Sequence, residues 1–102
     1  MYKQLSQIEA KNLIAKRETV ILDVRDEDSY KKAHIDGAKH LTVAELQIFC
    51  ETIDPKQPIL VYCYHGISSQ SVAQHLIEEG FREVYSLAGG FEAWKAAQSP
   101  SE

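Results

Sequence analysis

An α/β fold, with a parallel sheet covered by helices on both faces, is predicted by the alternation of two kinds of segment along this chain. Mostly apolar runs lie at residues 20–24, 59–62 and 84–87, and such short continuous runs are typical of strands buried on both faces. Segments with helical spacing of apolar residues stand between them, joined by short connections. Strands that alternate with helices in this way form parallel sheets.

The size of the chain fits one domain. Its 102 residues are 44% hydrophobic, which supplies a single core, and we assign residues 1–97 to that domain and 98–102 to a loose tail. The net charge is −4 and the basic residues are scattered, so a nucleic-acid partner is not expected. No apolar stretch has the length of a membrane span or a secretory signal, and we expect a cytoplasmic protein.

The first helix is predicted from Ser6 to about Lys16. Ser6 and Glu9 have the spacing of a capping box, and Leu13 and Ile14 continue the apolar positions at helical spacing. The strand at 20–24 follows and ends in polar residues.

A second capping box is offered by Thr42 and Glu45. Leu46 and Cys50 then fall four residues apart on one helix face, which predicts that Cys50 is a core thiol. Two prolines within residues 54–58 end this segment before the strand at 59–62.

The next helix is predicted from about Ser68 to Gly80. Its apolar residues recur with amphipathic spacing, and Gly80 is a typical C-terminal stop. After the strand at 84–87, the pair Gly89 and Gly90 predicts a tight turn, and a last helix begins at Phe91.

Cys63 is the candidate nucleophile. It directly follows the strand at 59–62 and precedes a short loop that opens a helix, and ligands of parallel sheets bind at the carboxyl ends of strands. Backbone N–H groups and the helix N-terminus favour an anion there and lower the pKa of a thiol. The alternative is a buried inert thiol. Gly66 permits close backbone approach, and Ser68 and Ser69 can cap the helix while they offer hydroxyls, which favours the nucleophile.

The other candidates near Cys63 have weaker patterns. We expect His65 to be exposed, with a role as base or electrostatic partner of the thiol as the alternative. Tyr64 is expected to line the pocket mouth or to be exposed. Asp23 and Arg25 flank a strand end and are expected to form an ion-pair network that holds neighbouring loops, with direct substrate contact by Arg25 as the alternative. Structural or surface roles are expected for the remaining candidates, His34, His40, His75, Phe91 and Trp94.

Cys50 and Cys63 are too far apart in sequence for a CxxC motif, and no Cys and His spacing indicates a zinc site. Free thiols are expected, although a disulfide between the two stays open at this point.

Three ordered motifs resemble the rhodanese family of sulfurtransferases, and together they cover nearly the whole chain. They are Asp23-Val24-Arg25 with Tyr30, His34-Ile35-Asp36-Gly37-Ala38 and His40-Leu41; Cys63 with its loop; and Gly89-Gly90-Phe91-Glu92-Ala93-Trp94. The chain departs from the common pattern at Ser29, Ala33, Tyr64 and Ser68.

The resemblance implies a five-stranded parallel sheet and transfer of sulfane sulfur through a persulfide on Cys63. It implies that backbone N–H groups of six residues bind thiosulfate, namely Tyr64, His65, Gly66, Ile67, Ser68 and Ser69. The acceptor would be cyanide in an assay, or a small thiophile or thioredoxin-like dithiol, and no cofactor or metal would be needed. Because Tyr64 and Ser68 supply no positive charge where many members carry Arg, we expect weaker thiosulfate affinity than in the Arg-bearing members.

Three alternatives remain open from the sequence. A noncatalytic rhodanese-like binding or regulatory module is one. A cysteine phosphatase is less favoured, because its loop requires an Arg that clamps phosphoryl oxygens. Arsenate or selenium chemistry at the same thiol is the third.

Overall fold

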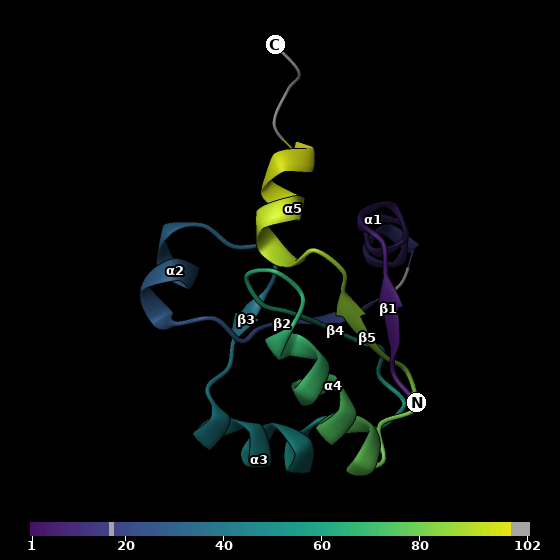
Figure 1. Cartoon of the computed structure of the whole chain (residues 1–102). Coiled ribbons are helices and arrows are strands. Elements are labelled where there is room, and N and C mark those ends of the chain that lie inside the picture. The colour runs from purple at the N-terminus through teal and green to yellow at the C-terminus, as the bar shows by residue number, and fades with distance from the viewer. Residues whose placement is uncertain (17, 99–102) are drawn as a thin grey trace.

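The computed structural model describes residues 1–16 and 18–98, and its centre is a five-stranded sheet (Figure 1). All strand pairs are parallel and the order is β1-β5-β4-β2-β3. The strands are β1 (Lys3–Leu5), β2 (Val20–Asp23), β3 (Lys39–His40), β4 (Ile59–Tyr62) and β5 (Val84–Leu87). The predicted α/β class and the five parallel strands that the resemblance implied are confirmed.

Helices cover both faces of this sheet. Figure 1 shows α1 and α5 over one face, α3 and α4 over the other, and α2 beyond the β3 edge. The helices are α1 (Gln7–Lys16), α2 (Glu27–Lys32), α3 (Val43–Thr52), α4 (Ser68–Glu78) and α5 (Gly90–Gln98). No helix in the described part of the chain has the length and apolar character that a membrane crossing requires.

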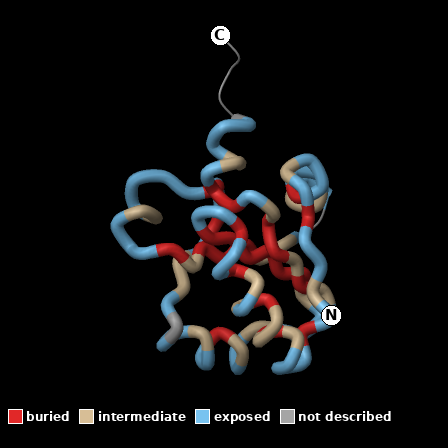
Figure 2. Tube along the Cα trace, viewed as in Figure 1, coloured by how far each residue is buried: buried red, intermediate tan, exposed pale blue. Residues whose placement is uncertain are grey.

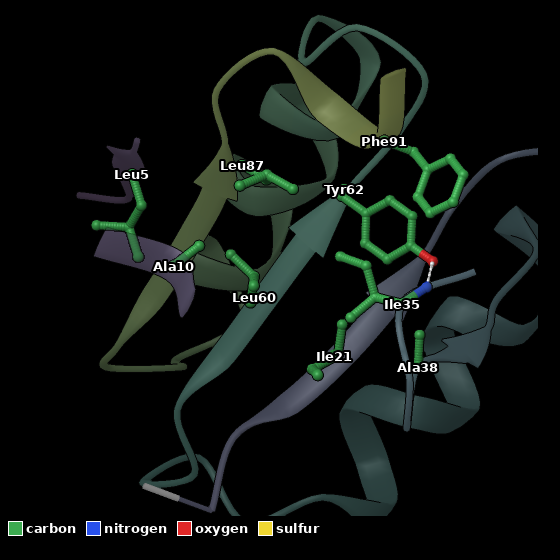
Figure 3. Close-up of a cluster of buried hydrophobic side chains, with 9 residues drawn as sticks. All are labelled: Leu5, Ala10, Ile21, Ile35, Ala38, Leu60, Tyr62, Leu87 and Phe91. Atoms are coloured by element: carbon green, nitrogen blue, oxygen red, sulfur yellow. Dashed lines mark hydrogen bonds between the residues drawn. The ribbon is translucent and has the colours of Figure 1, made fainter. Parts of the chain in front are cut away.

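Two apolar cores follow from the alternation of side chains along the central strands. Leu60 and Tyr62 of β4 pack beneath α1 and α5, where Phe91 stacks on the Tyr62 ring (Figure 3). Ile59 and Val61 point to the opposite face and pack with residues of α3 and α4. The buried residues therefore gather along the sheet in Figure 2.

The two capping boxes predicted from the sequence are confirmed. Ser6 and Glu9 exchange both bonds of a capping box, and so do Thr42 and Glu45. Cys50 is half-buried at the edge of the α3–α4 core, so it packs against the core without lying inside it. Gln98 ends α5, and the other residues of the expected tail lie outside the described part.

Three short elements were not predicted. β1 has three residues and β3 has two. Segments this short cannot show the alternation of apolar and polar residues that indicates a strand. Helix α2 is polar and has no buried residue, so no apolar spacing reveals it. Its only local signal is the cap, in which Asp26 accepts a hydrogen bond from the Ser29 N–H.

Candidate active site

The candidate site lies where three neighbouring strands end. Cys63 follows β4, which is flanked by β2 and β5. The segment after β2 carries Arg25, and the turn after β5 contains Gly89 and Gly90. Since all strands run the same way, these segments meet at the carboxyl edge of the sheet, which is where ligands bind in such folds.

The Cys63 sulfur is enclosed by its own loop, which we call the Cys63 loop (residues 63–67), and by the first turn of α4. Sγ accepts hydrogen bonds from the backbone N–H groups of Gly66 and Ser69, each at 3.2 Å. It also lies 3.3 Å from the Ser69 hydroxyl, and only 4% of Cys63 is exposed. The loop thus directs donors at one atom, as the sequence indicated.

The pKa of the Cys63 thiol is lowered by this arrangement. Burial alone raises it, but the hydrogen bonds from the Ser69 hydroxyl and from the N–H groups of Ser69, Gly66 and His65 outweigh that effect. Each of these donors stabilises the thiolate more than the thiol. The site therefore favours the form of cysteine that acts as a nucleophile.

Ser86 extends the hydrogen bonding of Cys63 into the sheet. Its hydroxyl lies 2.8 Å from the Ser69 hydroxyl, and both serines are fully buried. When the thiol is protonated, Cys63 donates to Ser69; when it is a thiolate, Ser69 must donate to sulfur and can accept from Ser86. Ser86 was not predicted from the sequence, although a serine inside an otherwise apolar buried strand is a usable signal.

The turn after β5 fixes the Cys63 loop from the other side. The N–H groups of Phe91 and Glu92, at the start of α5, donate to the carbonyls of Cys63 (2.8 Å) and Tyr64 (3.0 Å). Gly90 has φ +61°, and a Cβ on it would lie 2.4 Å from the Tyr64 oxygen. The sequence predicted only a tight turn here, because nothing local shows that it touches a loop more than twenty residues away in sequence.

The expectation that Ser68 and Ser69 cap α4 is wrong. Ile67 is the N-cap residue and no side chain caps the helix. Both serines lie inside its first turn, so the Ser69 hydroxyl points to sulfur instead of a free helix N–H. Ser68 is exposed.

Tyr64 connects the Cys63 loop to the start of α2. Its hydroxyl bonds with Asp26 and Ser29, and its ring lies near the Arg25 guanidinium. Tyr64 remains 38% exposed. His65 is exposed, as expected.

Asp23 and Arg25 form the predicted ion pair, at 2.7 Å, and both are buried. Arg25 also donates to the Ala33 carbonyl at 2.6 Å and lies over the Phe91 ring, while Tyr62 donates to Asp23 at 2.7 Å. The pair thus joins the loop after β2 to α2 and α5. The carboxylate of Asp23 neutralises the charge of Arg25, which favours the structural role over direct anion binding by Arg25.

The remaining candidates lie away from sulfur. His34 stacks on Tyr30, and the ring of His40 bonds with the Arg25 carbonyl. Phe91 is buried and Trp94 packs against the same core, as predicted. His75 is half-buried on α4. Cys50 and Cys63 are both free, so they form no disulfide. Among the described residues, no cluster of His, Cys, Asp or Glu could hold a metal ion.

Known proteins are similar to this chain over nearly its whole length. The family model described as a rhodanese-like domain matches residues 6–97. A Coxiella burnetii protein named thiosulfate sulfurtransferase GlpE is 62% identical over 102 residues, which are 100% of this chain and 95% of that protein. A Vibrio cholerae protein of the same name is 46% identical over 93 residues, 91% of this chain and 88% of the relative.

Solved structures agree as well. The rhodanese-like domain of an Anabaena protein, determined by solution NMR, superimposes with a TM-score of 0.83 at 28% identity, covering 97% of this chain and 77% of that one. The family model spans the whole region between the first capping box and the last helix. The chain therefore belongs to the rhodanese-like domain family.

Proposed function

We propose that this chain is a thiosulfate sulfurtransferase that carries sulfane sulfur as a persulfide on Cys63. The observation that carries the proposal is the pair of backbone N–H groups, from Gly66 and Ser69, that converge on Sγ at 3.2 Å. The names of the Coxiella and Vibrio relatives support the same reaction. The matched regions span nearly all of the chain and so include the Cys63 loop.

The first step is attack of the Cys63 thiolate on the outer sulfur of thiosulfate. The new Sγ–S bond forms as the S–S bond of thiosulfate breaks, and sulfite leaves with the electron pair of that bond. The product is a Cys63 persulfide anion. Backbone N–H groups from Tyr64 to Ser69, with His65, Ile67 and Ser68 among them, hold the persulfide and the sulfonate oxygens by hydrogen bonds to their negative charge.

The second step passes the outer sulfur to an acceptor. Cyanide attacks that sulfur, the S–S bond breaks, and thiocyanate leaves while Cys63 returns to the thiolate. A thiol, including a thioredoxin-like dithiol, reacts in the same way. The persulfide form of the enzyme is the product of the first half-reaction and the reactant of the second. This predicts ping-pong kinetics.

No cofactor enters this chemistry, because the lowered pKa of Cys63 supplies the nucleophile without a metal or a separate base. Asp23 and Arg25 support the loops around the site. We place the reaction in the cytoplasm, where reducing conditions keep both thiols free.

Mass spectrometry of the intact protein after thiosulfate treatment tests the proposal. A mass increase of roughly 32 Da, one sulfur atom, is expected on Cys63 and should disappear on addition of cyanide with release of thiocyanate. Cys63→Ser should remove the adduct and Cys50→Ser should keep it. An unmodified Cys63 would favour a noncatalytic binding module, and hydrolysis of an aryl phosphate that depends on Cys63 would favour a phosphatase.

A further inference from the structure

A groove of about 710 Å³ runs beside the Cys63 loop. It lies between the start of α2, helix α3 and the first turn of α4, and its apolar lining consists of Val24, Leu41, Leu46 and Val72. The volume is in the range of small-molecule sites, roughly 300–1,000 Å³.

The groove lies next to the Cys63 loop, although none of residues 63–67 is among its lining residues. Ser68 lines it, and the next residue, Ser69, donates its N–H to the Cys63 sulfur. The hydroxyl of Tyr64, a residue of the Cys63 loop, also bonds with Asp26, which lines the groove. A molecule in this groove therefore lies alongside the loop that would carry the persulfide.

Carboxylates dominate the charge of the groove. Asp26, Glu27 and Glu45 all line it and all are exposed. Hydrogen bonds from the Ser29 side chain and backbone lower the pKa of Asp26, and those from Thr42 lower the pKa of Glu45, so both stay ionised at neutral pH.

The cationic groups nearby do not cancel this charge. Arg25 also lines the groove, but its guanidinium is paired with Asp23. Lys31 pairs with Glu27 at 3.3 Å in an exposed position, where such pairs are weak. The ring of His40 is engaged with the Arg25 carbonyl. An anionic ligand would thus meet like charge, whereas a cation with an apolar stem would be complementary.

We propose that this groove binds the sulfur acceptor, and that the acceptor it selects is a small thiol with an apolar stem and a cationic amine. The inference rests on the proposed function. In the step, the acceptor thiol gives its proton to the Cys63 persulfide anion, and the resulting thiolate attacks the outer sulfur. The S–S bond to Sγ breaks, and Cys63 leaves as a thiolate. The product is the persulfide of the acceptor, so atoms and charge balance without an oxidant.

Three thiols of similar size test the charge preference. The Cys50→Ser protein is loaded with thiosulfate, and sulfur transfer to cysteamine, N-acetylcysteamine and 3-mercaptopropionate is followed by loss of the persulfide mass. Each rate is divided by the rate of the same thiol with a small disulfide, which removes differences in thiol reactivity. At low salt, cysteamine should react about tenfold faster than N-acetylcysteamine, and the anionic 3-mercaptopropionate should react slowest. In 0.5 M salt the differences between the three rates should become smaller.

Glu45→Gln and Glu51→Gln form a matched pair. Both remove one carboxylate from α3, but Glu45 lines the groove and Glu51 does not; Gln also serves in a capping box. Glu45→Gln should reduce the advantage of cysteamine about threefold, whereas Glu51→Gln should leave it unchanged. Equal rates for the three thiols, or equal effects of the two variants, would overturn the proposal.

A second arm separates this proposal from the proposed function. If thiosulfate loads no sulfur, the proposed function fails, and Cys63 is then converted to an uncharged mixed disulfide with 2-thiopyridine. Release of 2-thiopyridone by the same three thiols reports the charge preference of the groove without sulfur transfer. The release rates should follow the same order, cysteamine fastest and the anionic thiol slowest. Equal rates for the three thiols would refute the groove as an acceptor site.

Discussion

The two cysteines of the chain are both shielded from water, yet their surroundings shift their pKa values in opposite directions. Cys50, on the last turns of α3, has its pKa raised by burial and by the nearby carboxylates of Glu79 and Glu51. Cys63 is more buried, but its pKa is lowered by the hydrogen bonds that Ser69 and the loop donate. Burial raises the pKa of both thiols, and only the donors around Cys63 reverse it.

The difference shows that nucleophilicity here is a property of backbone placement. Cys50 belongs to a helix whose N–H groups are used within the helix, so none is left for its sulfur. Cys63 ends a strand, and the loop that follows turns free N–H groups toward it. Changes that move this loop should therefore alter Cys63 and leave Cys50 as it is.

The largest effect is expected for Gly90→Ala. A Cβ at this position would lie 2.4 Å from the Tyr64 oxygen and 2.6 Å from the Cys63 oxygen, so the loop must shift. A displacement of about 1 Å in such a site costs roughly 100-fold in rate, and we expect that loss in kcat/KM for thiosulfate. Steady-state transfer to cyanide measures it.

Gly80→Ala is the matched control for this change. Gly80 has φ +103°, so alanine is strained there as well, but a Cβ on it meets nothing within 4 Å. Both variants should lose stability in thermal unfolding, since alanine is disfavoured at positive φ. A similar loss of transfer in both would show that strain, and not contact with the loop, is responsible.

The contrast between these glycines marks what the sequence can and cannot predict. Capping boxes, apolar runs and the strand-to-loop position of Cys63 are local patterns, and the structure places them as expected. The contact between Gly90 and the Cys63 loop joins segments that only the parallel sheet brings together. Likewise, the groove arises from α2, α3 and α4 together, and α2 has no apolar period by which to find it.

A tenfold effect is expected for Ser69→Ala. The change removes a hydroxyl donor and keeps the N–H of residue 69, so the pKa of Cys63 should rise toward that of an ordinary thiol. A hydrogen bond to a charged group contributes about 1.5–3 kcal/mol, so at neutral pH the thiolate fraction and the transfer rate should fall about tenfold or more. Raising the pH should restore most of the rate.

Iodoacetamide alkylates both thiols in one sample, and its rate is measured for each cysteine separately over a range of pH. In the unmodified protein, the pH of half-maximal reactivity should be below that of a free thiol for Cys63 and above it for Cys50. Ser69→Ala should raise the value for Cys63 only. If the Cys63 profile does not move, the hydroxyl is not what stabilises the thiolate.

A smaller effect, and a gain, is expected for Ser68→Arg. Ser68 is exposed beside the loop, and the guanidinium of Arg25, which lines the same groove, is already paired with Asp23. A cation added at residue 68 should lower the KM for thiosulfate by roughly three- to tenfold through attraction to its charge. Gln74→Arg adds the same charge farther along α4 and should change KM much less. No gain for Ser68→Arg, or tight thiosulfate binding by the unmodified chain, would contradict the view that backbone donors alone bind the anion.

The smallest effect on transfer is expected for Cys50→Ser. The side chain is half-buried against the core between α3 and α4, so a hydroxyl there loses apolar contact and the free energy of unfolding should fall by about 1 kcal/mol. Transfer should stay within about twofold, because Cys50 lies on α3 and none of the donors to Cys63 comes from that helix. Urea unfolding and the cyanide assay measure the two quantities on one preparation. A large loss of transfer at unchanged stability would mean that the second thiol takes part in the reaction, and the separation between a nucleophilic and a packing cysteine would be wrong.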